Sequence, residues 1–537
     1  MSQDARQDEE QSTLRRAQVL GLDYYDTNID NKNIIQNILT NDEMYQFRIV
    51  PLVADQSNIL FGITTVTSQN SIKYIKEHFL DQRISFALIS DSGFKDYMKI
   101  FDPPKQIVYK DISISEDQKE TVSQISDILN QVNADDMLAY LVSQAHKLNA
   151  SDIHIETQRN EVRIRFRIDG VLHIVAKLSF DKYRILVSAV ASAANISTSS
   201  NEPQQGHISQ KVQMADHTEV DVNLRIETVL TVNGMDIVMR LFNMYQSMYN
   251  LDKLGLSDDE RRIVDDIIAK PTGLVMVVGP TGSGKTTTLY SMLNQLNNDQ
   301  RKIITVEDPV EYQFEGVTQM SIDSKGEHND SNFIDRLKAV LRIDPDVIMI
   351  GEIRDEDTAK TALQAALTGH LVLATFHADS ASAAITRLGS VIEENSLFIS
   401  AIRLIMAQRL VRKLDDNFKE SYMPDQAELD MLNRLLQKMP DSISKPEINE
   451  STTLYRPVVN EKNPFGYNGQ IAIREQYLMT DEIKKVISDV HQSKVISTDS
   501  INEAADRSGL NNMYGDGLNK VLSGLTTLTE VARVLDF

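Results

Sequence analysis

One segment of the chain has the composition and spacing of a phosphate-binding loop. Residues 279–287 match the pattern G-x-x-x-x-G-K-[ST] and directly follow the apolar run LVMVV. Glycines let such a loop turn its backbone N–H groups toward an anion at the N-terminus of the next helix. An ordinary glycine turn is the alternative reading, but the strand before the loop and the helix after it favour a nucleotide site. The predicted loop consists of Gly279, Pro280, Thr281, Gly282, Ser283, Gly284, Lys285, Thr286 and Thr287.

Within this loop, two side chains have predicted roles. Lys285 is expected to contact the β- and γ-phosphates, and the Thr286 hydroxyl is expected to bind Mg²⁺.

A second metal-binding residue is predicted in LRIDPDVIMIGEIRD, where the apolar strand VIMIG ends at Glu352. A carboxylate at the carboxyl edge of a parallel sheet lies beside the phosphate loop and can hold Mg²⁺ through water. Taken alone, Glu352 would more often be a helix cap or a solvated residue.

A further acidic segment, IITVEDPVE at residues 303–311, ends another predicted buried strand. One of its carboxylates could polarise the water that attacks a phosphate, as a general base or a positioning group. We favour Glu307 over Glu311 for this role. The alternative is a simple turn at Asp308-Pro309.

Two histidines, His370 and His377, flank the apolar segment LVLATF. Their separation is odd, so a regular strand would point them to opposite faces, and they do not form a ready metal pair. Without cysteines or a third ligand nearby, zinc is not expected. An imidazole near a γ-phosphate is the functional reading, although each histidine taken alone is more often structural.

The elements that must position these residues begin at Leu251. From there apolar strands alternate with helices, which is the pattern of a parallel sheet covered by helices and predicts an α/β fold. The predicted strands are GLVMVVG, KIITVED, DVIMIGE and HLVLATF, and the predicted helices start at Lys285, near 332 and at 356. Residues 413–465 interrupt this pattern with five prolines around one helical segment, and we interpret them as a surface insertion.

Upstream of Leu251 the sequence predicts two smaller units. Residues 1–16 are expected to be a polar tail, and residues 17–115 a small α/β module. A linker that contains a helix is predicted at 116–134. Residues 135–250 are predicted to form an α+β domain with an amphipathic helix, a hairpin around 150–178, and a second strand pair joined by a turn at Asn233 and Gly234.

Composition narrows the classes of function. Lys plus Arg (55) against Asp plus Glu (77) gives a net charge of −22, which opposes the phosphate attraction that dominates nucleic-acid binding. The absence of cysteine excludes disulfides, thiol catalysis and thiolate metal sites. The first 16 residues lack the apolar core of a secretory signal, and no apolar run approaches the roughly 20 residues that span a bilayer. We therefore expect a soluble enzyme whose membrane association, if any, is peripheral.

The order of the motifs resembles that of the type II secretion and type IV pilus ATPases. After the phosphate loop come TVEDPVE, LRIDPDVIMIGEIRD, TGHLVLATFHADSA and AQRLVRKL, which are similar to the family's aspartate, Walker B and histidine boxes and the segment after them. Upstream, ASDIHIE and VRIRFRIDGVLH look like the family's second N-terminal domain. Downstream, GYNGQIAIREQYLMTDEI looks like its C-terminal subdomain. The resemblance spans residues 135–537, and residues 1–115 have only a loose likeness to the partner-docking first domain.

This resemblance implies a RecA-like ATPase core after a PAS-like α+β domain, with ATP and Mg²⁺ bound. By motif match, Lys285 and Thr286 bind phosphate and Mg²⁺, Glu352 is the Walker B acid, Glu307 is the catalytic candidate and His377 senses the γ-phosphate. The resemblance also implies a cytoplasmic homohexamer at the inner membrane. Its implied partners are a membrane platform protein and a cytoplasmic docking protein.

Three departures from the family pattern concern zinc and the arginines that act across subunits. Residues 413–465 take the place of a four-cysteine zinc insertion but contain no Cys, so no zinc is expected. His207 stands where an arginine is typical, and the D-x-R and GER patterns are replaced at 221–223 and 234–236. We hypothesise that Arg225 or Arg240 acts in trans instead, because Arg225 lies two residues beyond Asn223 on the same strand face.

The leading functional reading is a motor for type IV pilus assembly. The long first domain argues against a retraction motor. The missing zinc residues, together with the divergence of that first domain, favour a type IVb, bundle-forming-type system. A type II secretion ATPase is the alternative within the family. From other classes, a nucleotide-binding scaffold with negligible hydrolysis and a conjugative DNA translocase remain open, although the charge of −22 disfavours the second.

Overall fold

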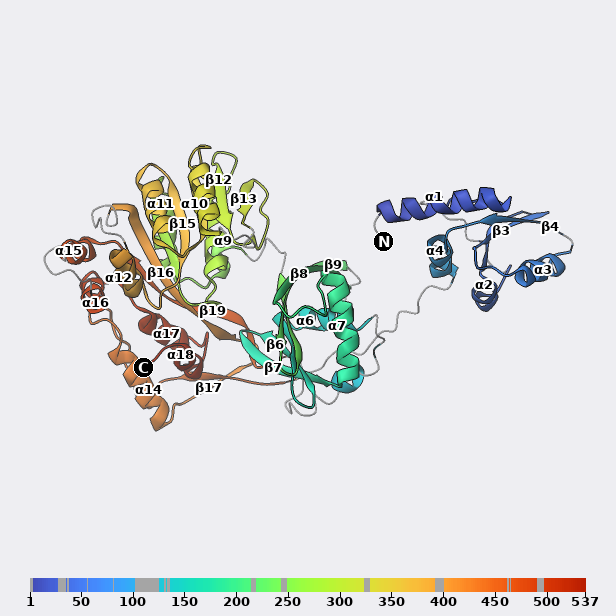
Figure 1. The fold of residues 1–537 in the computed structure, drawn as a ribbon. Helices are drawn as coiled ribbons and strands as arrows, with labels where there is room; N and C mark the ends of the chain where they lie inside the picture. Colours follow the sequence, from blue (N-terminus) through green and yellow to red (C-terminus); the bar gives the residue numbers. More distant parts are fainter. Residues whose placement is uncertain are drawn as a thin grey trace. The chain divides into compact units, whose positions relative to one another are not determined.

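A computed structural model describes most of the chain. The described residues are 3–27, 35, 38–55, 57–80, 82–101, 125–129, 132, 136–213, 219–242, 249–322, 329–391, 400–460, 463, 465–489 and 497–537. The chain divides into two units, Met1–Val108 and Tyr109–Phe537. Figure 1 shows the fold of each unit.

The first unit is an α/β module whose four-stranded sheet has the order β1-β4-β3-β2. Strand β4 is parallel to β1 and β3, and β2 is antiparallel to β3. The small α/β module predicted from the sequence is thus confirmed for the described residues of this unit. The elements are α1 (Gln3–Leu20), β1 (Asp23–Tyr24), α2 (Asn41–Phe47), β2 (Ile49–Ala54), β3 (Asn58–Ile63), α3 (Gln69–His78), β4 (Arg83–Leu88) and α4 (Asp91–Phe101).

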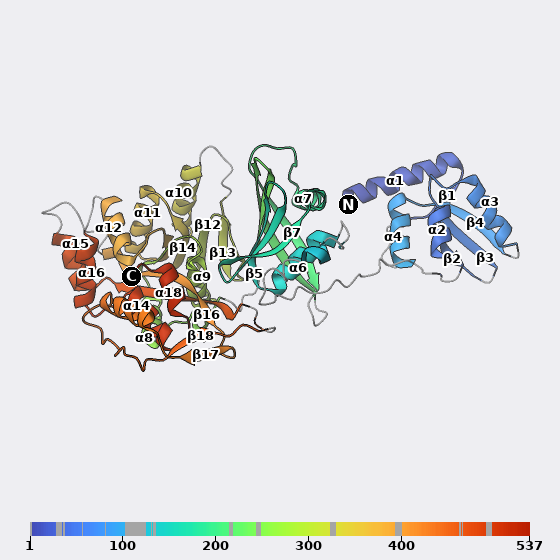
Figure 2. The same ribbon diagram turned by 90° about the horizontal axis from the view of Figure 1, so that it is seen from below.

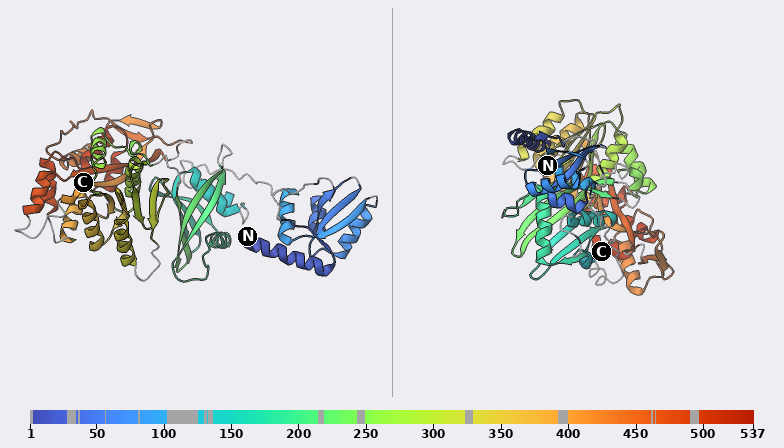
Figure 3. Two further views of the ribbon diagram at one scale, coloured as in Figure 1. Left: turned by 90° about the horizontal axis from the view of Figure 1, so that it is seen from above. Right: turned by 90° about the vertical axis from the view of Figure 1, so that its right-hand side faces the viewer.

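The prediction of a polar tail at residues 1–16 is wrong, because helix α1 begins at Gln3 and lies alongside the sheet (Figure 3). Its Glu10 carboxylate is buried and accepts hydrogen bonds from the hydroxyls of Tyr24, Thr27 and Ser90 at 2.7–2.8 Å. A polar sequence therefore forms an ordered helix here because its carboxylate is satisfied by hydroxyls from distant segments.

An α+β domain begins the second unit. Six antiparallel strands have the order β7-β6-β5-β10-β9-β8, and α6 and α7 cover the apolar face of the sheet (Figure 1). Both predicted strand pairs and the predicted helix are confirmed. The elements are α6 (Met137–Lys147), β5 (Ala150–Thr157), β6 (Val162–Ile168), β7 (Val171–Leu178), α7 (Phe180–Ala194), β8 (Gln204–Gln213), β9 (Glu219–Thr231) and β10 (Gly234–Phe242).

The described part of the predicted linker belongs to this domain. Residues 125–129 are helical, and Ile125, Leu129 and Val132 are buried in the same core as the sheet. The rest of the stretch 116–134 lies outside the described residues.

Residues 251–537 form the domain built on the predicted parallel sheet, which we call the parallel-sheet domain. Its seven strands have the order β13-β12-β14-β15-β11-β16-β19, parallel except for the last pair. Figure 2 shows helices α10, α11 and α12 of this domain beside strands β12, β13 and β14. The predicted α/β fold is thus confirmed. The elements through the sheet are η3 (Leu251–Lys253), α8 (Asp258–Ile268), β11 (Gly273–Val278), α9 (Lys285–Leu296), β12 (Ile303–Glu307), β13 (Val317–Ser321), α10 (Asn329–Val340), β14 (Val347–Ile353), α11 (Glu356–Leu367), β15 (Leu371–Phe376), α12 (Ala381–Val391), β16 (Ile402–Leu414) and β19 (Tyr467–Leu478).

The segment predicted to be a surface insertion is part of a folded subdomain. Its apolar residues Leu432, Leu435 and Leu454 share a buried core with Leu518 and Leu528. Helix propensity placed the helix correctly, but its apolar face needed a partner that lies far along the chain. The elements of this subdomain are β17 (Lys419–Tyr422), α14 (Gln426–Gln437), β18 (Leu454–Pro457), α17 (Met513–Leu522) and α18 (Leu528–Val534). Helices α15 (Asp481–Asp489) and α16 (Thr498–Arg507) instead share the core of the parallel sheet with α12.

Candidate nucleotide site

The predicted phosphate loop connects the fully buried strand β11 to helix α9. Gly279, Gly282 and Gly284 have φ angles of 154°, 78° and 82°, a region that side chains other than glycine rarely adopt. A Cβ on Gly282 would meet no atom within 4 Å, so its backbone angle alone requires glycine there. Gly284 occupies the N-cap position of α9 and has no side chain to cap it, which leaves the first amides of the helix suited to an anion.

Lys285 folds back over the loop. Its Nζ donates hydrogen bonds to the carbonyl oxygens of Gly279 and Pro280, both at 2.9 Å. Burial lowers the pKa of Lys285, whereas the nearby Glu352 carboxylate acts in the opposite direction. The two carbonyl oxygens therefore hold the Lys285 amino group at the loop, in contacts that an anionic phosphate could replace.

Glu352 lies between a histidine and an arginine. Its Oε1 is 2.8 Å from His377 Nε2, and its Oε2 is 3.1 Å from Arg354 Nε. Arg354 also contacts Asp308 Oδ2 at 3.3 Å. The end of β14, the end of β15 and the acidic segment after β12 therefore meet at one edge of the sheet, beside the phosphate loop.

Two residues in this site were not predicted individually, Gln408 and Arg409 on strand β16. The buried Gln408 side chain donates to the Ser283 carbonyl at 2.7 Å and accepts from the Thr288 hydroxyl at 3.0 Å, which braces the loop from behind. Arg409 contacts Asp379 at 3.3 Å and is close enough to Lys285 to affect its pKa. The signal available in the sequence was the polar pair in the otherwise apolar run LIMAQRLV.

Glu307 is separate from this group of charges. Its carboxylate is only 3% exposed and accepts hydrogen bonds from the hydroxyls of Tyr290 and Thr305 and from the Gln319 amide. Burial raises the pKa of Glu307, although the three hydrogen bonds oppose that shift. A carboxyl group with a raised pKa at the end of a strand suits a proton acceptor.

The two histidines lie at opposite ends of β15. His377 follows the carboxyl end of the strand and contacts Glu352. His370 precedes the strand, and its Nδ1 is 2.9 Å from the Ala365 carbonyl oxygen, a local structural contact. Only His377 therefore belongs to the candidate site. Among the described residues, no group of three or more His, Asp or Glu side chains has the arrangement of a metal site.

The candidate arginines lie on the polar face of the α+β domain. Arg225 and Arg240 are direct cross-strand partners on β9 and β10, and His207 pairs with Arg225 from β8. Arg240 contacts Asp152 at 2.8 Å, and Arg225 contacts Glu227 at 3.1 Å.

Both arginines also act on the acidic segment of the same chain. The pKa of Glu311 is raised by desolvation and by the neighbouring Glu307, while Arg240 and Arg225 oppose that rise. The structure thus brings the arginine pair near Glu311, but it records no contact between either arginine and Lys285, Glu352 or His377.

The residues present fit ATP and Mg²⁺. The glycine backbone and the uncapped helix suit a polyphosphate, and the Thr286 hydroxyl and the Glu352 carboxylate are the hard oxygen ligands that Mg²⁺ prefers. When bound, Mg²⁺ would neutralise charge on the phosphate oxygens.

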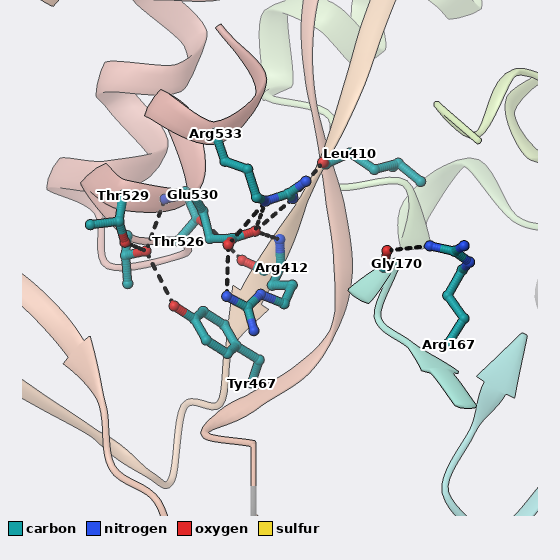
Figure 4. Close-up of polar contacts among 10 residues, drawn as sticks. Arg167, Gly170, Leu410, Arg412, Tyr467, Thr526, Thr529, Glu530 and Arg533 are labelled. Atoms are coloured by element: carbon teal, nitrogen blue, oxygen red, sulfur yellow. Dashed lines mark hydrogen bonds and ion pairs between the residues drawn. The ribbon is translucent and has the colours of Figure 1, made fainter. Parts of the chain in front are cut away.

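A second polar cluster lies where the α+β domain meets the parallel-sheet domain (Figure 4). The β6–β7 turn at Asp169 and Gly170 reaches the start of β19, where Asp169 accepts a hydrogen bond from the Gly469 amide at 3.3 Å. Arg167 donates to the Gly170 carbonyl oxygen at 3.0 Å. Gly170 has a φ angle of 79°, which side chains other than glycine rarely adopt, so the backbone of this turn favours glycine.

In the same region of the parallel-sheet domain, Glu530 binds two arginines. It accepts hydrogen bonds from the Arg412 amide and from the guanidinium groups of Arg412 and Arg533, at 2.8–2.9 Å (Figure 4). The Arg412 guanidinium also lies 4.0 Å above the Tyr467 ring. Burial alone would raise the pKa of Glu530, but the hydrogen bonds from Arg533 and Arg412 lower it to about 2.

This cluster predicts acid sensitivity. The depressed pKa means that Glu530 stabilises the fold fully above its unfolded pKa of about 4.5, and that this stabilisation is lost as pH falls toward about 2. The lowered pKa of Glu530 corresponds to a contribution of roughly 3 kcal/mol to the free energy of unfolding at neutral pH. We expect Glu530→Gln to lower the unfolding free energy by about that amount at pH 7 and by little at pH 2, as measured by urea titration at several pH values.

The matched control for this prediction is Glu420→Gln, which removes one partner of the exposed Glu420–Arg456 pair. Exposed pairs contribute about 0–1 kcal/mol, so this variant should unfold nearly like the wild type. A Glu530→Gln variant that is equally destabilised at both pH values would contradict the assignment.

Comparison with known proteins places residues 130–533 in the family described as Type II/IV secretion system protein. Type II secretion system protein E of Xanthomonas campestris is 38% identical over 78% of this chain and 70% of its own length. The Pseudomonas aeruginosa protein E is 39% identical over 73% of this chain and 74% of its own. Type II secretion system ATPase E of Vibrio cholerae is 38% identical, with the same coverage.

Solved structures support the fold. The Legionella pneumophila ATPase DotB matches with a TM-score of 0.53 and 21% identity, over 74% of this chain and 94% of DotB. The Yersinia pseudotuberculosis DotB matches with a TM-score of 0.54 at the same identity. In the described part of the chain, no helix has the length and apolar character needed to cross a membrane.

Proposed function

The chain belongs to the type II/IV secretion system protein family, and from this premise we propose that it is a Mg²⁺-dependent ATPase that works as a hexameric motor. The observation that carries the proposal is the grouping of Lys285, Glu352 and His377 at a glycine-rich loop. Catalysis of phosphoryl transfer depends mainly on positioning and electrostatic stabilisation, and these side chains supply both. Named relatives are secretion ATPases, which supports the same activity.

In this proposal the loop amides and Lys285 hold the β- and γ-phosphates of ATP. Thr286 and Glu352 hold Mg²⁺, and His377 is placed to respond to the γ-phosphate through its contact with Glu352. Glu307 orients the attacking water and accepts its proton. Arg225 or Arg240 stabilises the charge that develops on the γ-phosphate, supplied by a neighbouring subunit.

Hydrolysis would drive the extrusion of pilin-like subunits through an inner-membrane platform protein, with the motor at the cytoplasmic face and recruited by partners. Two machines use such a motor. The names of the relatives favour a type II secretion system. The absence of cysteine favours the type IV pilus assembly reading made from the sequence. Co-purification with a secretion platform protein or with a pilus platform protein distinguishes the two.

The test of the proposed activity is Mg²⁺-dependent phosphate release per subunit as a function of protein concentration, with particle mass measured on the same samples. A rate that rises as hexamers form supports a ring motor with composite sites. Verified hexamers that do not hydrolyse ATP, even with the cytoplasmic domain of the platform protein added, would instead indicate a nucleotide-binding scaffold. Strong DNA binding near physiological salt would favour a translocase.

A further inference from the structure

The Glu307 carboxylate is tied to the helix that carries the phosphate loop through a single side chain, Tyr290. Two of its three donors, Thr305 and Gln319, come from β12 and the adjacent β13. The third donor, the Tyr290 hydroxyl, comes from α9, whose first residue is Lys285. Tyr290 therefore links the candidate catalytic carboxylate directly to the helix that binds the nucleotide.

The same hydroxyl also fixes the other end of the acidic segment. It accepts a hydrogen bond from the Glu311 backbone amide at 3.2 Å while it donates to Glu307 Oε2. A tyrosine hydroxyl can donate one hydrogen bond and accept others, so both contacts are compatible. One side chain thus holds the first and last residues of the segment 307–311.

The ring of Tyr290 has little freedom to move. It is fully buried, and it makes edge-on contacts with Tyr249 and Phe314, both with centroids 5.1 Å away. Tyr249 is itself held by Asn294 of α9, which donates to its carbonyl oxygen at 2.8 Å. Because the ring is fixed by packing, the direction of its hydroxyl is fixed as well.

The remaining hydrogen-bonding capacity of Glu307 is on the oxygen that Tyr290 orients. A carboxylate offers about four acceptor positions, two on each oxygen. Thr305 and Gln319 both donate to Oε1, and Tyr290 donates to Oε2. By this count the open position, meaning the one without a protein donor, is on Oε2, whose orientation Tyr290 sets.

We propose that Tyr290 is a positioning residue for ATP hydrolysis, which holds Glu307 Oε2 in register with the phosphate loop so that its open acceptor position can receive the proton of the attacking water. The inference rests on the proposed function, because it requires Glu307 to take part in hydrolysis. It assigns to Tyr290 a role beyond packing in the core.

The test is Tyr290→Phe, which removes the hydroxyl and keeps the ring. We expect kcat for ATP hydrolysis to fall about 10- to 100-fold, while the affinity for a fluorescent ATP analogue with Mg²⁺ stays within about twofold because the loop itself is unchanged. The matched control is Tyr312→Phe, which removes a hydroxyl from the same aromatic cluster and should leave both quantities unchanged. Unchanged kcat in Tyr290→Phe, or an equal loss of kcat and affinity, would overturn the proposal.

A double-mutant cycle with Glu307→Gln separates this inference from the proposed function. If Tyr290 acts through Glu307, then Tyr290→Phe should have no further effect on kcat in the Glu307→Gln background. A loss of kcat in the double variant equal to the product of the two single losses would refute the proposed role of Tyr290. A wild type that binds MgATP without hydrolysing it, with the platform domain present, would refute the proposed function. In that case the thermal unfolding midpoints of the wild type, the two single variants and the double variant would still test the contact between Tyr290 and Glu307. Additive shifts of the midpoint would show that the two side chains are not coupled.

Discussion

Replacing Glu352 by glutamine is expected to lower kcat for ATP hydrolysis by about 10²- to 10³-fold, the loss typical when one preorganised electrostatic group is removed. The reason is the position of this carboxylate between His377 and Arg354, within electrostatic reach of Lys285. Glutamine keeps the shape but not the charge, so it can neither hold Mg²⁺ effectively nor balance the charges of Arg354 and Lys285. Since the loop stays intact and more positive, ATP should bind at least as tightly as in the wild type.

The measurement is phosphate release, together with binding of a fluorescent ATP analogue. Glu356→Gln is the matched control, because it makes the same chemical change in the same segment, at an exposed glutamate that pairs only locally with Lys360. That variant should hydrolyse ATP like the wild type. A Glu352→Gln protein that keeps more than a tenth of wild-type kcat would show that this carboxylate is not the metal-binding acid.

The parts of the site that could be predicted from sequence are those set by local pattern. The phosphate loop follows from glycine spacing next to an apolar strand, and the structure shows the positive φ angles that this spacing implies. Glu352 and His377 each follow an apolar run, and parallel strands necessarily bring such ends to one edge of the sheet. The strand order itself, with β15 between β11 and β14, was not needed for that prediction.

The parts that could not be predicted depend on contacts between distant segments. Gln408 braces a loop 125 residues earlier in the chain. The polar pair at 408–409 in an apolar strand indicates a special position, but it does not indicate which segment Gln408 contacts. Glu307 was predicted from its strand, but its burial under Tyr290 depends on how α9 packs on the sheet. The first 16 residues look like a polar tail in the sequence. The partners of their Glu10 carboxylate, the hydroxyls of Thr27 and Ser90, lie outside this segment, so its own residues do not predict these contacts.

Removal of the Arg240 side chain is expected to have the largest effect among the arginines. Its guanidinium is held by the buried Asp152, yet 60% of its side chain remains exposed, so it is both oriented and accessible. Arg225 is less exposed and is paired with Glu227. An arginine finger contributes roughly 10³- to 10⁵-fold to the rate of phosphoryl transfer, so Arg240→Ala should lower kcat by at least the smaller factor.

The matched control is Arg163→Ala. Arg163 lies on strand β6 of the same domain, two strands away from β10, and pairs with Glu161. This variant should hydrolyse ATP like the wild type if the effect is specific to the arginine pair. Full activity in both Arg225→Ala and Arg240→Ala would end the hypothesis that either residue replaces the family's usual arginines.

Mixing two inactive variants decides whether Arg240 acts on its own subunit or on its neighbour. Within one chain Arg240 already acts electrostatically on Glu311, so action in cis is a real alternative. In a ring with head-to-tail interfaces, each interface joins Arg240 of one subunit to Glu352 of the next. When the Arg240→Ala and Glu352→Gln variants are mixed in equal amounts, about one in four interfaces has both of these residues intact. Action in trans therefore predicts recovered hydrolysis on mixing. Action in cis requires Arg240 and Glu352 from the same chain. It therefore predicts no recovery, because every subunit in the mixture lacks one of these two groups.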